Sequence, residues 1–155
     1  MATEIERKFL LSDDSWRSYI EDSVVIRQGY LAGSEKTSIR VRVAGDMANI
    51  NIKSATLDIT RKEYEYLIPL EEANEILDTL CEGPIIEKIR YYIHQENHRW
   101  EIDVFSGDNQ GLVVAELELN DINEEFSRPD WLGKEVSDDS RYYNVCLVTH
   151  PYKDW

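Results

Sequence analysis

The sequence has little cysteine and no long apolar run. Only Cys81 and Cys146 are cysteines, without the spacing of a metal site or a disulfide framework. No apolar run approaches the roughly 18 residues that cross a bilayer. The start of the chain, residues 1–8, is charged where a signal peptide is apolar. These features exclude a disulfide-stapled scaffold and a membrane-spanning helix, and we expect a cytoplasmic protein with buried thiols.

Basic residues are also scarce. Lys and Arg number 17 against 31 Asp and Glu, which gives a net charge of −14. A protein that binds duplex nucleic acid attracts phosphates with a basic surface, so this balance argues against that class. It is compatible with a small polyanion, because a few basic residues gathered in one cleft can bind phosphate while surplus carboxylates hold divalent cations.

Alternation of polar and apolar residues is the main pattern in the chain. It predicts a β-strand wherever it runs for several residues, since side chains of a strand alternate between two faces. We expect strands near Glu4–Leu11, Val24–Leu31, Thr37–Val43, Met47–Ser54, Ile59–Pro69, Ile85–His94, Arg99–Phe105 and Leu112–Leu119. Gly45-Asp46 forms a two-residue hairpin turn. One α+β domain over 1–155, built on an antiparallel sheet or barrel, follows from this order.

Three short helices are expected between or after the strands. Ser12 is placed to cap the first, which carries Trp16. The second spans Glu71–Cys81 and stops before Gly83, and the last runs from about Asp138 to Val148.

Charge occupies nearly every polar position of the strands. Two acids or two bases often sit two residues apart, on one face of one strand, as in Arg40 and Arg42 or Glu116 and Glu118. A solvated sheet face is the plain explanation. Like charges so placed repel unless a counter-ion lies between them, however, and these faces have few Ser, Thr or Gln. Paired acids suit Mg²⁺ or Mn²⁺, and paired bases suit phosphate oxygens. If the sheet closes, both sets converge on one lumen.

An ordered series of motifs carries a resemblance to a known family. Glu4-x-Glu6-x-Lys8 opens it, and the others follow in order: Arg27-Gln28-Gly29-Tyr30-Leu31, Ser38-Ile39-Arg40-Val41-Arg42, Lys53-Ser54, Arg61-Lys62-Glu63-Tyr64-Glu65, Glu87-Lys88-Ile89-Arg90-Tyr91, Glu101-Ile102-Asp103-Val104-Phe105, Glu116-Leu117-Glu118 and Gly133-Lys134-Glu135-Val136, then Asp139, Arg141, Tyr142 and Asn144. The series spans the chain and resembles the CYTH proteins, or triphosphate tunnel metalloenzymes, especially the short bacterial members.

The resemblance implies an eight-stranded antiparallel tunnel with short helices outside and a C-terminal helix near one end. It implies hydrolysis of inorganic triphosphate with Mg²⁺ or Mn²⁺, by a monomer or homodimer without nucleic-acid or membrane partners. The expected phosphate-binding residues are Lys8, Arg40, Arg42, Lys53, Lys88 and Arg90. The expected metal-binding or tunnel acids are Glu4, Glu6, Glu63, Glu65, Asp103, Glu116 and Glu118. Lys8 and Lys88 are the candidate catalytic residues, Lys88 to orient or deprotonate the attacking water.

Several alternatives stay open. Within the family, the substrate could be thiamine triphosphate, a nucleoside triphosphate or the substrate of an adenylate cyclase; outside it, the chain could be a non-catalytic polyphosphate-binding module. The short length favours the bare polyphosphate. His94 and His98 flank a hairpin tip and are expected to have no metal role, whereas Tyr30 and Arg141 could each reach a tunnel mouth.

Overall fold

The fold is a β-barrel, described for residues 2–155 in a computed structural model. Nine strands form its sheet: β1 Thr3–Leu11, β2 Asp22–Gly33, β3 Thr37–Ala44, β4 Met47–Ser54, β5 Thr60–Leu67, β6 Glu82–Gln95, β7 His98–Phe105, β8 Val113–Leu119 and β9 Leu132–Glu135. The eight expected strands correspond to β1–β8. The short β9 was not expected, because four residues are too few to show alternation.

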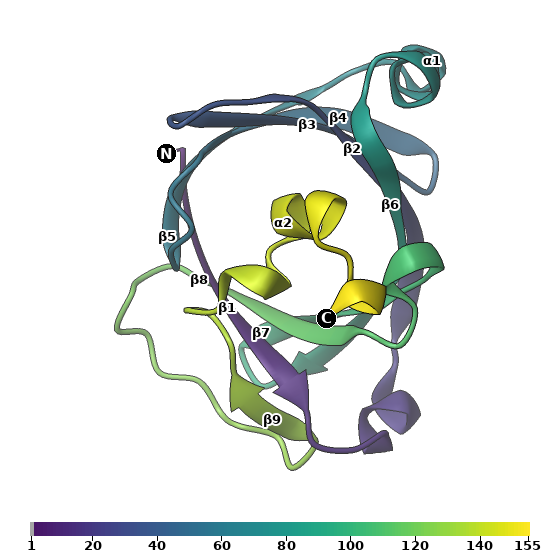
Figure 1. Cartoon of the computed structure of the whole chain (residues 1–155). Coiled ribbons are helices and arrows are strands. Elements are labelled where there is room, and N and C mark those ends of the chain that lie inside the picture. Colours follow the sequence, from purple (N-terminus) through teal and green to yellow (C-terminus); the bar gives the residue numbers. More distant parts are fainter. Residues whose placement is uncertain (1) are drawn as a thin grey trace.

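The sheet closes on itself. Its strand order is β5-β4-β3-β2-β6-β7-β8-β1-β9, and a further antiparallel pairing joins β5 to β1. Figure 1 looks through the ring that results. The expected eight-stranded barrel is therefore confirmed, with β9 added beside β1. Gly45-Asp46 forms the expected hairpin turn between β3 and β4, and Gly45 has a φ of 62°, a conformation that glycine adopts easily.

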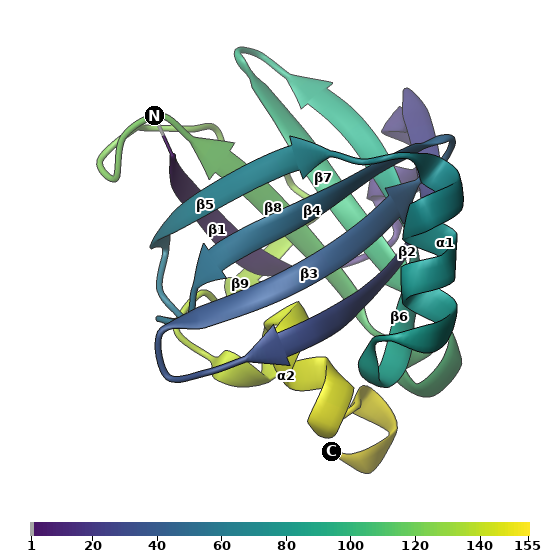
Figure 2. The ribbon, with the colours of Figure 1, turned by 90° about the horizontal axis from the view of Figure 1, so that it is seen from above.

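Closure gives each strand an inner and an outer face. The charged positions share the inner face, as the register of β1 with β8 shows: Glu6 lies opposite Glu118, and Lys8 opposite Glu116. The apolar positions between them face outward and form two cores. One packs Phe9, Trp16, Ile93, Trp100, Ile102, Ala115, Leu117, Leu119 and Trp131. The other packs Val41, Val43 and Ala48 against Ala73 and Leu77 of helix α1, Leu70–Thr79. Figure 2 shows α1 along the outside of the barrel.

A third core lies on the inner face, at one end. Ile86, Phe105, Leu112, Val114 and Leu147 are buried together there. Leu147 belongs to helix α2, Asn144–Thr149, which lies within the barrel opening in Figure 1. The expected C-terminal helix near one tunnel end is thus confirmed, and it closes that end with apolar side chains.

Two of the helix expectations need correction. The first helix is a 3₁₀ turn, Ser15–Tyr19, and Ser12 does not cap it, because the Ser12 hydroxyl donates to the Asp130 carbonyl. The last is not continuous from Asp138 to Val148. A 3₁₀ turn at Ser140–Tyr142 comes first, and Tyr143 is extended before α2 begins. The Tyr143 hydroxyl donates to the Ser137 carbonyl and Asp139 caps the turn, so local hydrogen bonds break the helix. Within residues 2–155 no helix is long and apolar enough to span a bilayer.

Candidate functional site in the barrel lumen

The lumen holds a cavity of about 280 Å³. Its charged lining brings together side chains from β1, β3, β4, β5, β6, β7 and β8. The acids are Glu4, Glu6, Glu63, Glu65, Glu101, Glu116 and Glu118, and the bases are Lys8, Arg40, Arg42, Lys53, Arg61, Arg90 and Arg99. Of the residues expected at the site, only Lys88 and Asp103 are not in this lining.

Three arginines form the basic side of the cavity. Arg40 and Arg42 come from β3, and Arg90 comes from β6. Arg90 is held by acids, with its Nη1 2.6 Å from an oxygen of Glu101 and its Nε 2.8 Å from one of Asp103. Arg42 differs, since no carboxylate in residues 2–155 lies within 4.0 Å of its guanidinium nitrogens. Burial, together with Arg40 and Arg90, lowers the pKa of Arg42 to about 10. The positive charge of Arg42 is therefore not balanced by a nearby carboxylate.

Lys88 and Asp103 lie behind the cavity. Lys88 is 2% exposed, and its Nζ is 2.5 Å from Asp103 Oδ2 and 2.9 Å from Asn144 Oδ1. Burial is the main reason that the pKa of Lys88 falls to about 7, and Arg90 and Arg42 add to it against the opposing effect of Asp103. Asp103 is expected from the sequence as an acid of the tunnel, but its oxygens already accept hydrogen bonds from Lys88 and Arg90.

Lys8 and Glu116 form a buried pair on the wall between β1 and β8. Lys8 Nζ lies 2.9 Å from an oxygen of Glu116 and 3.1 Å from one of Glu6. Burial lowers the pKa of Lys8, but the two carboxylates outweigh it and raise the pKa well above its usual value. Lys8 is therefore a permanent positive charge in the cavity.

Carboxylates crowd one side of the lumen. Burial raises the pKa of Glu118, and Glu4, Glu6, Glu101 and Glu63 raise it further. The pKa of Glu6 is also raised, by burial first and then by Glu116. In the described part of the chain, no three His, Cys, Asp or Glu side chains are grouped closely enough to hold a metal ion as they stand. The donors are nonetheless hard oxygens that repel one another, which is the donor chemistry of Mg²⁺ and Mn²⁺ sites.

The wall formed by β4 and β5 completes the cavity. Lys53 Nζ bridges oxygens of Glu4, at 3.2 Å, and Glu63, at 3.1 Å. Glu65 accepts a hydrogen bond of 2.8 Å from Asn51, which is fully buried. These acids and Lys53 therefore meet the rest of the site, as strand parity predicted.

Three residues at the site carried no expected role: Asn144 and Tyr143 line the cavity, and Gln28 is fully buried outside that lining. Gln28, on β2, and Asn144, at the start of α2, link Arg42 to Lys88 by hydrogen bonds. Tyr143 places its ring 5.0 Å from Lys8 Nζ. Gln28 and Asn144 stood in the motif series without a role, and Gln28 is in phase with Tyr30. This shared strand parity was the one feature of the sequence that could have placed Gln28 at the site.

The comparisons with known proteins agree with this geometry. The family model described as the CYTH domain matches residues 2–149 of this chain. This chain belongs to the CYTH family. A curated relative from Acetivibrio thermocellus, named inorganic triphosphatase, is 49% identical over 155 residues, covering 100% of this chain and 99% of that one. An inorganic triphosphatase from Nitrosomonas europaea is 35% identical over 150 residues, 94% and 97% of the two chains.

A solved structure has a similar architecture. The crystal structure of the inorganic triphosphatase NE1496 superposes with a TM-score of 0.66 at 32% identity, covering 96% of this chain and 95% of that chain. The resemblance drawn from the motif series is confirmed.

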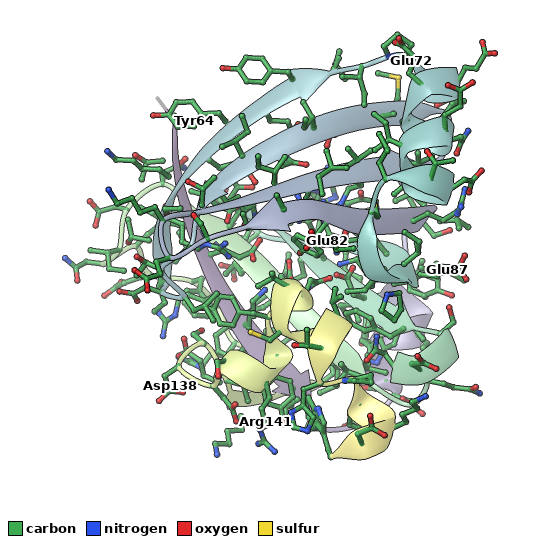
Figure 3. The ribbon with its side chains drawn as sticks, turned by 45° about the horizontal axis from the view of Figure 1, so that its top comes forward. Tyr64, Glu72, Glu82, Glu87, Asp138 and Arg141 are labelled. Carbon is green, nitrogen blue, oxygen red and sulfur yellow. The ribbon has the colours of Figure 1, made fainter. Side chains whose placement is uncertain are left out.

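Four residues that could have belonged to this CYTH site are also placed. Tyr30 lines the cavity. Arg141 does not; it pairs with Asp139 at 2.8 Å and points away from the barrel in Figure 3. His94 and His98 flank the β6–β7 turn and pair separately with Glu21 and Glu124.

Proposed function

We propose that this chain hydrolyses inorganic triphosphate to pyrophosphate and phosphate inside the barrel, with a divalent metal. The observation that carries the proposal is Arg42, which faces a charged cavity beside Arg40 and Arg90 and has no carboxylate of residues 2–155 within 4.0 Å. A linear polyanion supplies the missing negative charge. Guanidinium groups bind phosphate oxygens with paired donors, so the cluster is suited to this ligand.

The size and the closed end of the cavity favour a substrate without an organic group. Drug-sized ligands occupy pockets of about 300–1,000 Å³, and this cavity of about 280 Å³ lies just below that range. Leu147 and Phe105 fill the end beside α2 with apolar side chains. A nucleoside or thiamine group would need one end to open.

Four acids of the lining suit a bound metal. Glu4, Glu6, Glu116 and Glu118 would hold it, with Glu63 and Glu65 nearby and Asp103 occupied as a counter-ion. Mg²⁺ and Mn²⁺ both take such oxygen ligands. When bound, the metal neutralises charge on the phosphate oxygens and lowers the pKa of a coordinated water.

The two candidate catalytic lysines would have different tasks. Lys8 stays charged because Glu116 and Glu6 hold it, so it stabilises negative charge on the substrate. Lys88, with a pKa of about 7, is partly neutral near neutral pH and is able to accept a proton. Its Nζ lies behind the cavity and donates to Asp103 and to Asn144, which lines the cavity, so Lys88 would act on the attacking water through Asn144.

A panel of substrates tests the proposal and separates it from its rivals. Phosphate release is measured with tripolyphosphate, pyrophosphate, ATP and thiamine triphosphate, each with Mg²⁺, with Mn²⁺ and with excess chelator. We expect turnover of tripolyphosphate above the others and none in chelator. Preference for ATP or thiamine triphosphate would assign the organic substrate instead. Tight tripolyphosphate binding without turnover in either metal would make the chain a binding module.

A further inference from the structure

A chain of hydrogen bonds joins two cations of the site through two neutral amides. Arg42 Nε donates to Gln28 Oε1 at 2.9 Å, and Gln28 Nε2 donates to Asn144 Oδ1 at 2.8 Å. Lys88 Nζ donates to the same Asn144 oxygen at 2.9 Å. We propose that Gln28 and Asn144 are positioning residues, which fix Arg42 and Lys88 for the substrate and make helix α2 part of the site.

The direction of each bond in the chain is set by chemistry. Arginine and charged lysine carry only donors, so each must meet an oxygen. Gln28 must therefore turn its oxygen to Arg42, which leaves its nitrogen for Asn144. Asn144 must present its oxygen, because both of its partners donate. Each amide has one orientation that satisfies all its partners.

The surroundings of Gln28 require a reason for its polarity. The residue is 0% exposed, and its neighbours across and along the strands include Ile86, at 2%, and Ile26, at 1%. An aliphatic residue suits such a position better, because burying an amide costs free energy unless it is hydrogen-bonded. Both hydrogen bonds of Gln28 are made with residues of the site, Arg42 and Asn144. These two bonds explain why a polar residue occupies this buried position.

Neutral partners suit cations that must bind a polyanion. A carboxylate in place of Gln28 would hold Arg42 equally well but would cancel the charge that attracts phosphate. With Nε bound to an amide, Arg42 is fixed, and its two terminal nitrogens, which bond to nothing in residues 2–155, can meet the substrate. Arg40 is held in the same way, by its Nε at 3.3 Å from Asn51 Oδ1. Both arginines of β3 thus rest on an amide oxygen from a neighbouring strand.

The inference rests on the proposed triphosphatase function, and a set of variants tests it. Gln28→Leu keeps the volume and removes both bonds, and we expect KM for tripolyphosphate to rise about 5- to 10-fold. Gln28→Glu keeps an acceptor for Arg42 but adds a negative charge, so KM should rise further. Asn144→Leu removes one of the two acceptors that fix Lys88 and leaves only Asp103, so it should lower kcat more than it raises KM. A packing role for Gln28 predicts another order: Gln28→Leu would keep KM, and Gln28→Glu would lose thermal stability.

Asn74→Leu is the matched control. Asn74 Oδ1 accepts a hydrogen bond of 3.2 Å from Arg27, an arginine–amide contact outside the cavity lining. Its removal should leave kcat and KM unchanged. If Asn74→Leu and Gln28→Leu change KM equally, or if Gln28→Leu leaves KM unchanged, the inference is wrong.

A spectroscopic readout separates this inference from the proposed function. The Nε–H signal of Arg42 in ¹⁵N NMR should exchange slowly with water in the unmodified protein and rapidly in Gln28→Leu, but stay slow in Asn74→Leu. This result would support the positioning role even if the protein released no phosphate from tripolyphosphate. Fast exchange in the unmodified protein would overturn the positioning role even in an active enzyme.

Discussion

The inner and outer faces of one strand have opposite effects on stability, and β8 is a clear case. Its outward residues Ala115, Leu117 and Leu119 are at most 5% exposed and lie in the largest apolar core. Its inward residues Glu116 and Glu118 face the charged lumen. Burial of the first set stabilises the fold, at about 25 cal/mol per Å² of apolar surface. Removing the second set from water costs free energy that ion pairs only partly return.

The difference indicates that the outer cores hold together a lumen that would not form alone. Several inner groups lack enough opposite charge, Arg42 on one side and Glu118 on the other. Changes on the outer face should therefore lower stability and spare substrate binding. Changes on the inner face should impair substrate binding or catalysis, and they should spare stability where the group removed is short of opposite charge.

The largest loss of stability is expected on the outer face, from Trp100→Ala. Trp100 is 1% exposed, and its ring meets those of Phe9 and Trp131 edge-on, each at 5.6 Å between centroids. Its removal should cost about 3–5 kcal/mol of unfolding free energy, measured by urea denaturation. KM for tripolyphosphate should stay unchanged while the variant is folded. Tyr19→Ala, at a residue 60% exposed, is the control and should change stability by less than about 0.5 kcal/mol.

The next largest effect is expected on the inner face, from Glu116→Gln, and it concerns activity. The change keeps the shape but removes a charge from the proposed metal acids, so kcat/KM should fall on the order of 100-fold. Excess Mg²⁺ should restore part of the activity if metal binding is what was lost. Lys8 and Arg90 also lose a counter-charge, at 2.9 and 3.3 Å. A variant with full activity at low metal would remove Glu116 from the metal site.

Arg40→Ala should weaken substrate binding without a response to metal. It deletes a charge-assisted contact of roughly 1.5–3 kcal/mol, or about 10- to 150-fold in affinity for tripolyphosphate. Stability should hold or rise, because Arg40 and Arg42 repel each other. Calorimetric titration with tripolyphosphate at two Mg²⁺ concentrations measures the loss of affinity and shows whether metal changes it. Unchanged affinity would mean that the basic side of the cavity does not hold the phosphates.

The sequence predicted the two faces well, for a physical reason. Side chains alternate strictly along a strand, so the shared parity of Lys8, Arg40 and Glu116 follows from their positions in the chain alone. Parity does not say what fills each level of the lumen, however. Phe105 and Val114 are in phase with Asp103 and Glu116, yet they lie in an apolar core. That core depends on α2, whose position is set by tertiary contacts.

The sequence also did not predict which side chains contact one another. Gln28 and Asn144 are 116 positions apart in the chain, and no local pattern predicts that they meet. Asp103 has the parity of a metal ligand, but only the structure reveals that Lys88 and Arg90 occupy its oxygens. Periodicity identifies the face of a strand on which a side chain lies. Which side chains meet across the barrel depends on the register of the strands and on how the sheet closes.

The smallest effect tests whether charge on the outer face behaves differently from charge in the lumen. Arg7 binds Glu135 with two hydrogen bonds, at 2.9 and 2.5 Å, beside the first core. The hydrogen bonds from Arg7 lower the pKa of Glu135. This stability is therefore present above the unfolded pKa of about 4.3 and is lost as pH falls through the lower folded value. Glu135→Gln should cost about 0.5–1 kcal/mol at pH 7 and less at pH 2, with KM unchanged. Glu87→Gln removes a looser pair, 3.7 Å from Arg27, and should cost nothing at either pH. Urea denaturation at both pH values measures the differences. If the cost of Glu135→Gln persisted at pH 2, it would come from packing and not from charge.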